Sequence, residues 1–506
     1  MKKIASTVAL ALAAAAGAGT AVAQPALAGA LPAAPGVTGV SAPGAVTRAP
    51  MLVRASALGE PRASVVPGGQ LWVRRYNGPG NILGNDDVAR SAAVSPDGST
   101  VYVTGYSQGA SSDEYATIAY NTATGAQLWV SRYNDPSNYG AEASSVAVSP
   151  GGGTVFVTGS DNAGSNGQDY VTVAYNAVTG AQLWVSRYDG AAHGNDYASK
   201  VAVSPGGSTV YVTGWSIGTS SIYYYDWATV AYNAATGAQL WVRRHSSQYG
   251  TSGASALAVS PGGGTVFVTG FSHGATSDDD YLTIAYDTAT GATRWLRRSN
   301  GPGNSVDQAY AVAVSPGGGT AYITGASIGA AGAWDYATIA YSAATGATRW
   351  VRRYSSSYGT SQGHALAVGP GGGTVYVTGF SAGATSGDDY ATVAYNAATG
   401  ARLWARRYNG PGNGTDEASS LAVSPAGGAV YVTGHSAGAT SADDYATVAY
   451  NAATGATRWA RRHTSSGGAS QASAVAVSPA TGTVFVTGYT TSLTSGEDYL
   501  TIAYSG

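Results

Sequence analysis

The chain of 506 residues contains no cysteine, and this absence excludes several kinds of site. Without thiols there can be no disulfide, no thiolate-bound metal and no cysteine nucleophile. Charge is scarce as well, because charged residues make up 10% of the chain and the formal net charge is −2. The sequence has no basic stripe to neutralise phosphates, so we expect no nucleic-acid partner.

Helical periodicity is missing beyond the N-terminus, and one β-rich stretch occurs eight times instead. The copy at 388–408 reads DDYATVAYNAATGARLWARRY. Its two halves are rich in β-branched and aromatic residues, and the Asn and Gly between them suit a tight hairpin. Two further apolar segments, 365–369 and 374–378, precede this stretch, and a Pro-Gly turn joins them to each other. Each repeat therefore predicts four short antiparallel strands, A to D.

The repeats have a fixed spacing of 54 to 56 residues between the prolines of successive A–B turns. These are Pro96, Pro150, Pro205, Pro261, Pro316, Pro370, Pro425 and Pro479. Four strands in a period of this length are typical of a β-propeller blade. The chain ends on a strand C at 499–504, whereas 69–76 is a strand D with no strand before it. The sequence thus predicts an all-β, eight-bladed propeller of four-stranded antiparallel blades, closed by an N-terminal outer strand.

Two motifs carry a resemblance to known repeats. Residues 94–105, VSPDGSTVYVTG, resemble YVTN-type repeats. Residues 449–459, AYNAATGATRW, are similar to the Thr-Gly-x-x-x-Trp hairpin of PQQ-like repeats. The chain from about 69 to 506 therefore resembles bacterial secreted β-propeller repeat proteins of the YVTN-type, PQQ-like or SBBP-like kinds. The resemblance implies the fold, but such propellers serve many functions.

The N-terminus has the pattern of a signal peptide. Two lysines, an apolar run from 4 to 16 and Ala21-Val22-Ala23 predict a signal peptide over 1–23 and a secreted, extracellular protein. The apolar run is too short, and too rich in Gly and Ala, to favour a transmembrane anchor. Residues 24–64 are dominated by Ala, Pro and Gly and predict a disordered linker, followed by the propeller over 65–506.

Every predicted strand D contains a tryptophan, followed three residues later by an arginine. The indoles could stack a sugar or a quinone, but packing between blades accounts for their presence in every repeat. An acid stands just before each strand C aromatic, so folding C onto D predicts an ion pair in each blade. We expect Asp389 to meet Arg407, and Asp498 to meet Arg75 across the two chain ends. A set of equivalent pairs favours a structural role over catalysis.

The B–C and D–A loops share one face and contain the length variation, so a localised function is expected there. One variable position follows the glycine of strand B. Its aromatic and histidine occupants are our candidate ligand contacts, together with His273: Tyr106, Trp215, Phe271, Phe380, His435 and Tyr489. Such rings suit sugars or peptide side chains, but they could equally fill the channel.

Metal sites are not expected from the sequence. Acidic B–C loops such as 277–280 and 441–444 could bind calcium through oxygen, but they lack the dense alternating acids of dedicated loops. The histidines have no chelating spacing. We therefore predict no metal, no cofactor and no catalytic residue.

Two functions remain open. The first is a secreted, monomeric, non-catalytic binding or scaffold module for a glycan, peptide or surface polymer, without membrane insertion. The alternative is a PQQ-type quinoprotein oxidoreductase, which the tryptophan-bearing hairpins and the number of blades suggest. Against it, the sequence has no vicinal cysteines, no insertion to form a cofactor chamber and no blade with distinctive acids and amides. We therefore place the binding module first.

Overall fold

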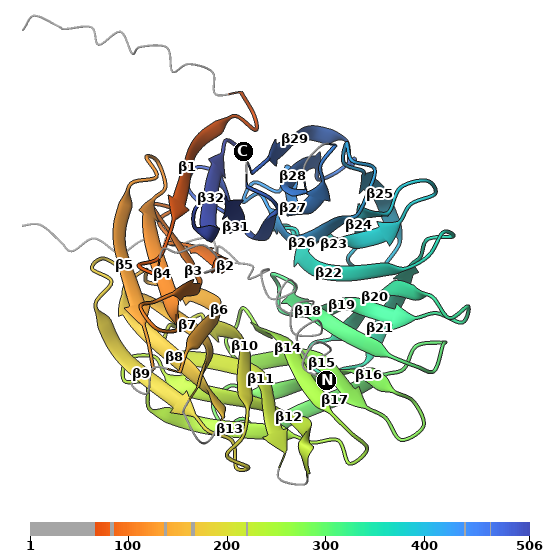
Figure 1. Cartoon of the computed structure of the whole chain (residues 1–506). Helices are drawn as coiled ribbons and strands as arrows, with labels where there is room; N and C mark the ends of the chain where they lie inside the picture. Colours follow the sequence, from red (N-terminus) through yellow and green to blue (C-terminus); the bar gives the residue numbers. More distant parts are fainter. Residues whose placement is uncertain are drawn as a thin grey trace, which may run out of the picture.

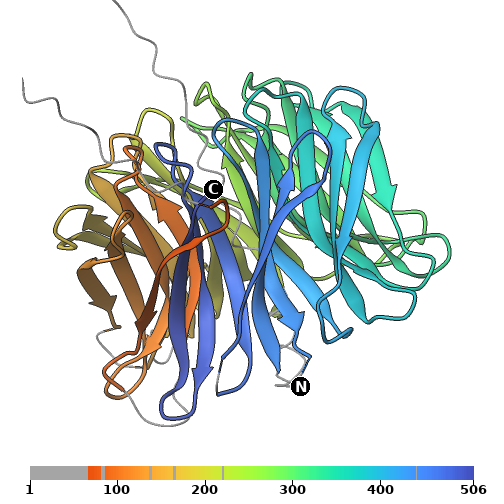
Figure 2. The same ribbon diagram turned by 90° about the horizontal axis from the view of Figure 1, so that it is seen from above.

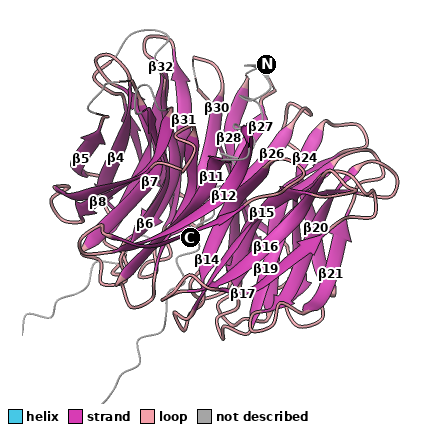
Figure 3. Ribbon diagram, turned by 90° about the horizontal axis from the view of Figure 1, so that it is seen from below, coloured by secondary structure: helices cyan, strands magenta, loops and turns pink. Residues whose placement is uncertain are grey.

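The computed structural model describes residues 66–80, 86–135, 139–162, 167–218, 221–439, 442–465 and 467–506. The predicted signal peptide and linker lie outside these residues. The described part contains strands β1 to β32 and no helix, arranged in eight four-stranded sheets. Neighbouring strands are antiparallel, and the sheets stand around a common axis, so the predicted propeller is confirmed (Figures 1 and 3). Accordingly, no described segment forms an apolar helix of membrane-spanning length.

Each of blades 1 to 7 runs from an inner to an outer strand in chain order (Figure 1). Blades 1 to 4 are β2 (Asp87–Val94), β3 (Thr100–Gln108), β4 (Asp113–Asn121), β5 (Gln127–Tyr133); β6 (Ala141–Val148), β7 (Thr154–Asn162), β8 (Gln168–Asn176), β9 (Gln182–Tyr188); β10 (Asp196–Val203), β11 (Thr209–Gly218), β12 (Ser221–Asn233), β13 (Gln239–His245); and β14 (Ser252–Val259), β15 (Thr265–His273), β16 (Asp279–Asp287), β17 (Thr293–Ser299).

Blades 5 to 7 are β18 (Asp307–Val314), β19 (Thr320–Ile328), β20 (Trp334–Ser342), β21 (Thr348–Tyr354); β22 (Ser361–Val368), β23 (Thr374–Ala382), β24 (Asp388–Asn396), β25 (Arg402–Tyr408); and β26 (Asp416–Val423), β27 (Ala429–Ala437), β28 (Asp443–Asn451), β29 (Thr457–His463). Blade 8 consists of β30 (Ser470–Val477), β31 (Val484–Ser492), β32 (Gly496–Tyr504) and, from the other end of the chain, β1 (Gln70–Tyr76).

The two ends of the described chain complete blade 8 together. Strand β1 pairs antiparallel with β32, with Trp72 opposite Ala503 and Tyr76 opposite Tyr499. In Figure 1 the orange-red β1 lies beside the blue β32. The Ser505 amide also donates to the Gly69 carbonyl oxygen at 2.9 Å. The predicted closure of the ring is therefore confirmed.

Blades are joined through the strand D tryptophans. The Trp72 indole donates to the carbonyl oxygen of Thr122, in the C–D turn of the next blade, at 2.9 Å. In seven of these junctions the corresponding indole bond measures 2.9 to 3.0 Å. The ring lies on a turn glycine, because a Cβ added to Gly125 would come within 2.6 Å of it. At the eighth junction Trp459 lies on Gly68 in the same way, so the N-terminal turn replaces the missing C–D turn.

The turns divide the ring into two faces, which Figure 2 shows from the side. The A–B and C–D turns bond to each other at one face, as in the bond from the Thr122 amide to the Ser99 carbonyl oxygen at 3.0 Å. The D–A and B–C loops meet at the other face, as in the bond from the Gly303 amide to the Ile328 carbonyl oxygen at 3.1 Å. We call this second face the loop face.

We predict that the N-terminal strand is required for a closed ring. A chain beginning at Val66 should keep the melting temperature of the full chain, because the turn and strand that close blade 8 remain. A chain beginning at Asn77 should aggregate and melt at a lower temperature, because the edge of β32 and the face of Trp459 become exposed. Light scattering and thermal unfolding measure both effects, and equal behaviour of the two truncated chains would contradict this account.

Candidate functional site

An arginine near the loop face connects the strands of each blade. In blade 6 an Arg407 Nη atom lies 2.8 Å from Asp389 Oδ2, and Arg407 also donates to Ser381 Oγ at 2.9 Å. Arg75 lies 3.9 Å from Asp498 across the two chain ends. Equivalent contacts of 2.5 to 3.0 Å join Arg132 to Glu114, Arg244 to Asp226, Arg298 to Asp280, Arg353 to Asp335 and Arg462 to Asp444. Each of these acids lies on the strand C of its own blade.

The same arginines also join neighbouring blades. Arg132 donates to the hydroxyl of Tyr76, in the preceding blade, at 2.7 Å. Arg244 donates likewise to Tyr188 at 2.9 Å. Arg132, Arg244 and Arg462 each connect an acid and a serine of their own blade with a tyrosine of the blade before it. This arrangement gives the ion pairs a structural role.

Blade 2 departs from this arrangement, so the expected Asp169–Arg187 pair is wrong. Arg187 instead lies 2.6 Å from Asp161 and 2.7 Å from Asp135. Asp161 stands where six other blades have serine, at the end of strand B. The diverted arginine leaves Asp169 near Asp189 and Asp196, and burial together with these acids raises the pKa of Asp169 to about 7.

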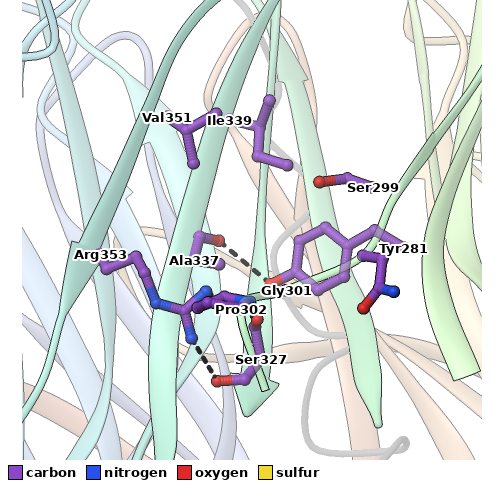
Figure 4. Close-up of a pocket in the computed structure, with 10 residues that line it drawn as sticks. Tyr281, Ser299, Gly301, Pro302, Ser327, Ala337, Ile339, Val351 and Arg353 are labelled. Atoms are coloured by element: carbon purple, nitrogen blue, oxygen red, sulfur yellow. Dashed lines mark hydrogen bonds between the residues drawn. The ribbon is translucent and has the colours of Figure 1, made fainter. Parts of the chain in front are cut away.

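A second departure creates a cavity of about 200 Å³ between blades 4 and 5 (Figure 4). Five blades end strand D in tyrosine, whose ring lies 5.3 to 5.6 Å from the strand C tyrosine. Blade 4 has Ser299 there instead. Ser299, Tyr281 and Arg353 line the space that the missing ring leaves.

We predict that Ser299→Tyr stabilises the protein by about 1 kcal/mol, because the new ring fills the cavity beside Tyr281 and its hydroxyl can reach Arg353. Chemical unfolding of the variant and of a Ser299→Ala control measures the change. Ser299→Ala should lack the gain, because it adds no volume. A loss of stability in Ser299→Tyr would show that the space cannot accept the ring.

The candidate aromatic residues at the loop face differ in exposure. Phe271 and Phe380 are only 4% and 7% exposed. Phe271 packs against Trp215 with ring centroids 5.3 Å apart, and Phe380 packs against His364 at the same distance. These two phenylalanines therefore pack against neighbouring rings, and their expected role as ligand contacts stays a prediction. Trp215 remains half-buried and also contacts Tyr225 at 5.9 Å.

The other candidates lie among acids. Tyr106, His435 and Tyr489 are half-buried. The guanidinium of Arg90 lies 4.7 Å from the centroid of the Tyr106 ring, and it contacts Glu142 at 2.7 Å. In the strand register His435 stands opposite Glu417. His273 Nδ1 lies 3.4 Å from Asp279 Oδ1.

Two groups of side chains therefore lie around the inner end of the loop face, which we call the mouth. The aromatic arc consists of Tyr197, Trp215, Tyr225 and Phe271, from blades 3 and 4. The acidic arc consists of Asp388, Glu417, Asp443, Glu497, Asp86, Asp113 and Glu142, from blades 6, 7, 8, 1 and 2 and the start of β2.

Burial and neighbouring acids raise the pKa values of two carboxylates of the acidic arc into the range of 6 to 7. Burial, together with the charge of Asp86, raises the pKa of Glu497 to about 7. Burial likewise raises the pKa of Asp113 to about 6, with contributions from Glu142 and Asp86. A cation placed among these groups would favour their ionised forms.

The sequence interpretation missed the acidic arc, although a signal for it was present. Several blades open strand C with two consecutive acids, as in Asp388-Asp389, Asp443-Asp444 and Glu497-Asp498. Successive side chains of a strand point to opposite faces of the sheet. The second acid meets the arginine, and the first lies near mouth groups such as Glu417. Two consecutive acids at the start of strand C therefore indicate a carboxylate at the mouth.

Comparisons with known proteins agree with the fold. A PQQ-like family model described as outer membrane protein assembly factor BamB matches residues 64–338, 226–439 and 335–497. None of the curated proteins compared matches the chain.

Solved propellers are similar at low identity. Chaetomium thermophilum Sqt1 bound to the N-terminus of ribosomal protein L10 is 12% identical, with a TM-score of 0.54, over 85% of this chain and 99% of that one. A europium-containing methanol dehydrogenase is 13% identical, with a TM-score of 0.50, over 86% and 93%. The periplasmic gluconolactonase of Pseudomonas aeruginosa is 16% identical, with a TM-score of 0.46, over 76% and 98%. For Sqt1 and the methanol dehydrogenase, the likeness at these identities shows the fold alone.

Proposed function

The chain belongs to the PQQ-like repeat family described as outer membrane protein assembly factor BamB, and within it we propose a secreted, non-catalytic binding module. Its binding surface is the mouth at the loop face. Its partner is a peptide segment or surface polymer that carries amines or guanidinium groups.

One observation supports this proposal above the others: departures from the repeat gather at the mouth. The tryptophan, the C–D turn glycine and the strand D arginine recur from blade to blade. The position that holds Tyr106, Trp215 and His435 in three blades is serine or alanine in two others. A structural ring needs equivalent blades, whereas a binding surface needs differences among them.

The chemistry of the two arcs favours a cationic partner. The acidic arc supplies carboxylates, while Arg90 is already engaged by Glu142 and by the Tyr106 ring. On the other side, the half-buried Trp215 and Tyr225 offer ring faces that attract cations and apolar stems. A lysine-rich or arginine-rich segment can use both kinds of contact at once.

A neutral glycan, the carbohydrate ligand expected from the rings alone, would use the aromatic arc but not the acidic one. The quinoprotein alternative gains no specific support from the site. The cavities described at the loop face measure about 200 and 360 Å³, and they lie beside strand D residues such as Ser299 and Arg407, at the periphery of the ring.

We predict that a deca-lysine peptide binds the full chain and that Glu417→Gln/Asp443→Asn weakens this binding at least about fivefold, because two carboxylates of the mouth are lost. Isothermal titration calorimetry at low salt measures the affinity. Asp287→Asn is the matched control, because Asp287 lies in a C–D turn where five other blades have asparagine.

Equal weakening by Asp287→Asn would show that net charge, not the mouth, attracts the peptide. Unchanged binding by the mouth variant would exclude the acidic arc as the contact surface. Tight binding of neutral oligosaccharides, lost in Trp215→Ala and kept in the acid variant, would assign the mouth to carbohydrate instead.

We also predict that the affinity for the peptide rises between pH 5 and pH 8. Because the pKa of Asp113 is about 6 and that of Glu497 about 7, both groups become charged across this range, while the lysines of the peptide stay protonated. Calorimetry at three pH values measures the change, and Glu497→Gln should reduce the slope. A flat profile, or affinity that falls with pH, would contradict the assignment of these carboxylates.

A further inference from the structure

Three aspartates converge where blades 2 and 3 meet at the loop face. Asp169 is the second residue of β8, Asp189 follows β9 and Asp196 begins β10. One carboxylate oxygen from each lies within 4.8 Å of the others. Asp169 and Asp196 are 5% and 0% exposed, so two of the three groups are withdrawn from solvent.

The counterparts of these residues in other blades show what is unusual here. The loop from 189 to 196 reads DGAAHGND, whereas the loops at 300–307 and 409–416 read NGPGNSVD and NGPGNGTD. Asp189 thus stands where those loops have asparagine. The blade 4 acid Asp280 is paired with Arg298 at 3.0 Å, while Asp169 has lost its arginine to Asp161 and Asp135. Asp189 has therefore added a carboxylate to this junction. Asp135 and Asp161 have drawn the Arg187 guanidinium away from it.

The three carboxylates are held in place yet left with open oxygens. Asp196 Oδ2 accepts the Gly190 amide at 2.5 Å, and Asp189 Oδ2 meets His193 Nδ1 at 2.6 Å. In all three residues Oδ1 is buried and has no hydrogen-bond partner. The same is true of Asp280 and Asp307 in blades 4 and 5, but there Arg298 lies 3.0 Å from the other oxygen of Asp280. The side chain of Asp169 makes no hydrogen bond or ion pair with any residue that the structure describes.

A buried carboxylate oxygen without a partner is costly, and three in one place indicate a missing positive ligand. The second oxygens, fixed by Gly190 and His193, correspond to the outer contacts that orient metal ligands. Three oxygens within 4.8 Å of one another lie at most about 2.8 Å from a common centre, so small side-chain adjustments bring them to calcium–oxygen bonds of about 2.4 Å. All three potential ligand atoms are carboxylate oxygens, which hard cations prefer.

We propose that Asp169, Asp189 and Asp196 bind one Ca²⁺ ion between blades 2 and 3. Calcium fits better than magnesium because it accepts longer bonds and irregular geometry, and water completes its coordination from the open loop side. The ion takes the place that the strand D arginine holds in the other seven blades, and it joins a strand C acid to the first strand of the next blade. This proposal is independent of ligand binding at the mouth.

The test uses the full chain after treatment with a chelator, titrated with Ca²⁺ and with Mg²⁺ by calorimetry and followed by thermal unfolding. We expect one Ca²⁺ site and, at saturating Ca²⁺, a melting temperature about 2–3 °C higher. Asp189→Asn should weaken Ca²⁺ binding at least about tenfold without loss of folding, because asparagine occupies this position in two equivalent loops.

A second variant leaves all three ligands intact. Asp135→Gly/Asp161→Ser installs residues that equivalent positions carry, so Arg187 should turn to Asp169 and Ca²⁺ binding should be lost. Glu417→Gln/Asp443→Asn, at the mouth, should bind Ca²⁺ as the unmodified chain does. The proposal is overturned if the unmodified chain binds no Ca²⁺ at millimolar concentration, if Mg²⁺ binds as tightly, or if Asp189→Asn retains full affinity.

Discussion

The contact on which the ring depends is the one between each strand D indole and the turn of the following blade. A single four-stranded blade has two apolar faces and can bury neither alone, so burial occurs only between blades. The indole of Trp72 is 6% exposed, and burying a ring of this size contributes about 2–3 kcal/mol. The contact requires glycine at the turn, because Gly125 has a φ of +68° and a Cβ there would meet the ring. Gly68, with a φ of +74°, meets the same two requirements where the chain ends join.

This constraint explains why the larger variation lies at the loop face. The C–D turns must keep the glycine that receives an indole, and the A–B turns bond to them, so both turns tolerate only small changes. The opposite ends of the strands bear no such requirement, and side chains there are free to differ. Gly253 illustrates the freedom: a Cβ at this position would lie 2.7 Å from the Trp215 ring, so the small residue makes room for the contact of Trp215 with Phe271 between blades 3 and 4.

The sequence predicted what repeats in each blade and failed where one blade meets the next. Periodicity and turn residues were sufficient for the strand order and for the Asp–Arg register of β24 and β25, because these depend on neighbours in the chain. The closure by β1 followed from counting strands, because the repeat left one strand D and one strand C without a partner. The burial of Phe271 depends on Trp215 of the preceding blade, and the cavity beside Ser299 depends on Arg353 of the following blade. Asp135, from the preceding blade, was equally invisible, because its effect is to help draw Arg187 away from Asp169. Such contacts follow from the arrangement of blades, which one repeat does not encode.

Because the blades are equivalent, comparing them separates residue replacements that serve a function from replacements that do not. Asp287 replaces the usual turn asparagine, but Arg294 compensates its charge within the same turn at 2.7 Å. Ser299 removes a ring and costs only packing volume. At the junction of blades 2 and 3 the replacements act in one direction, since they add a carboxylate and withdraw an arginine, leaving three aspartates together without the cation that Asp280 has in Arg298. A cost of that kind persists in a folded protein where something else offsets it, and a bound cation offsets all three charges at once.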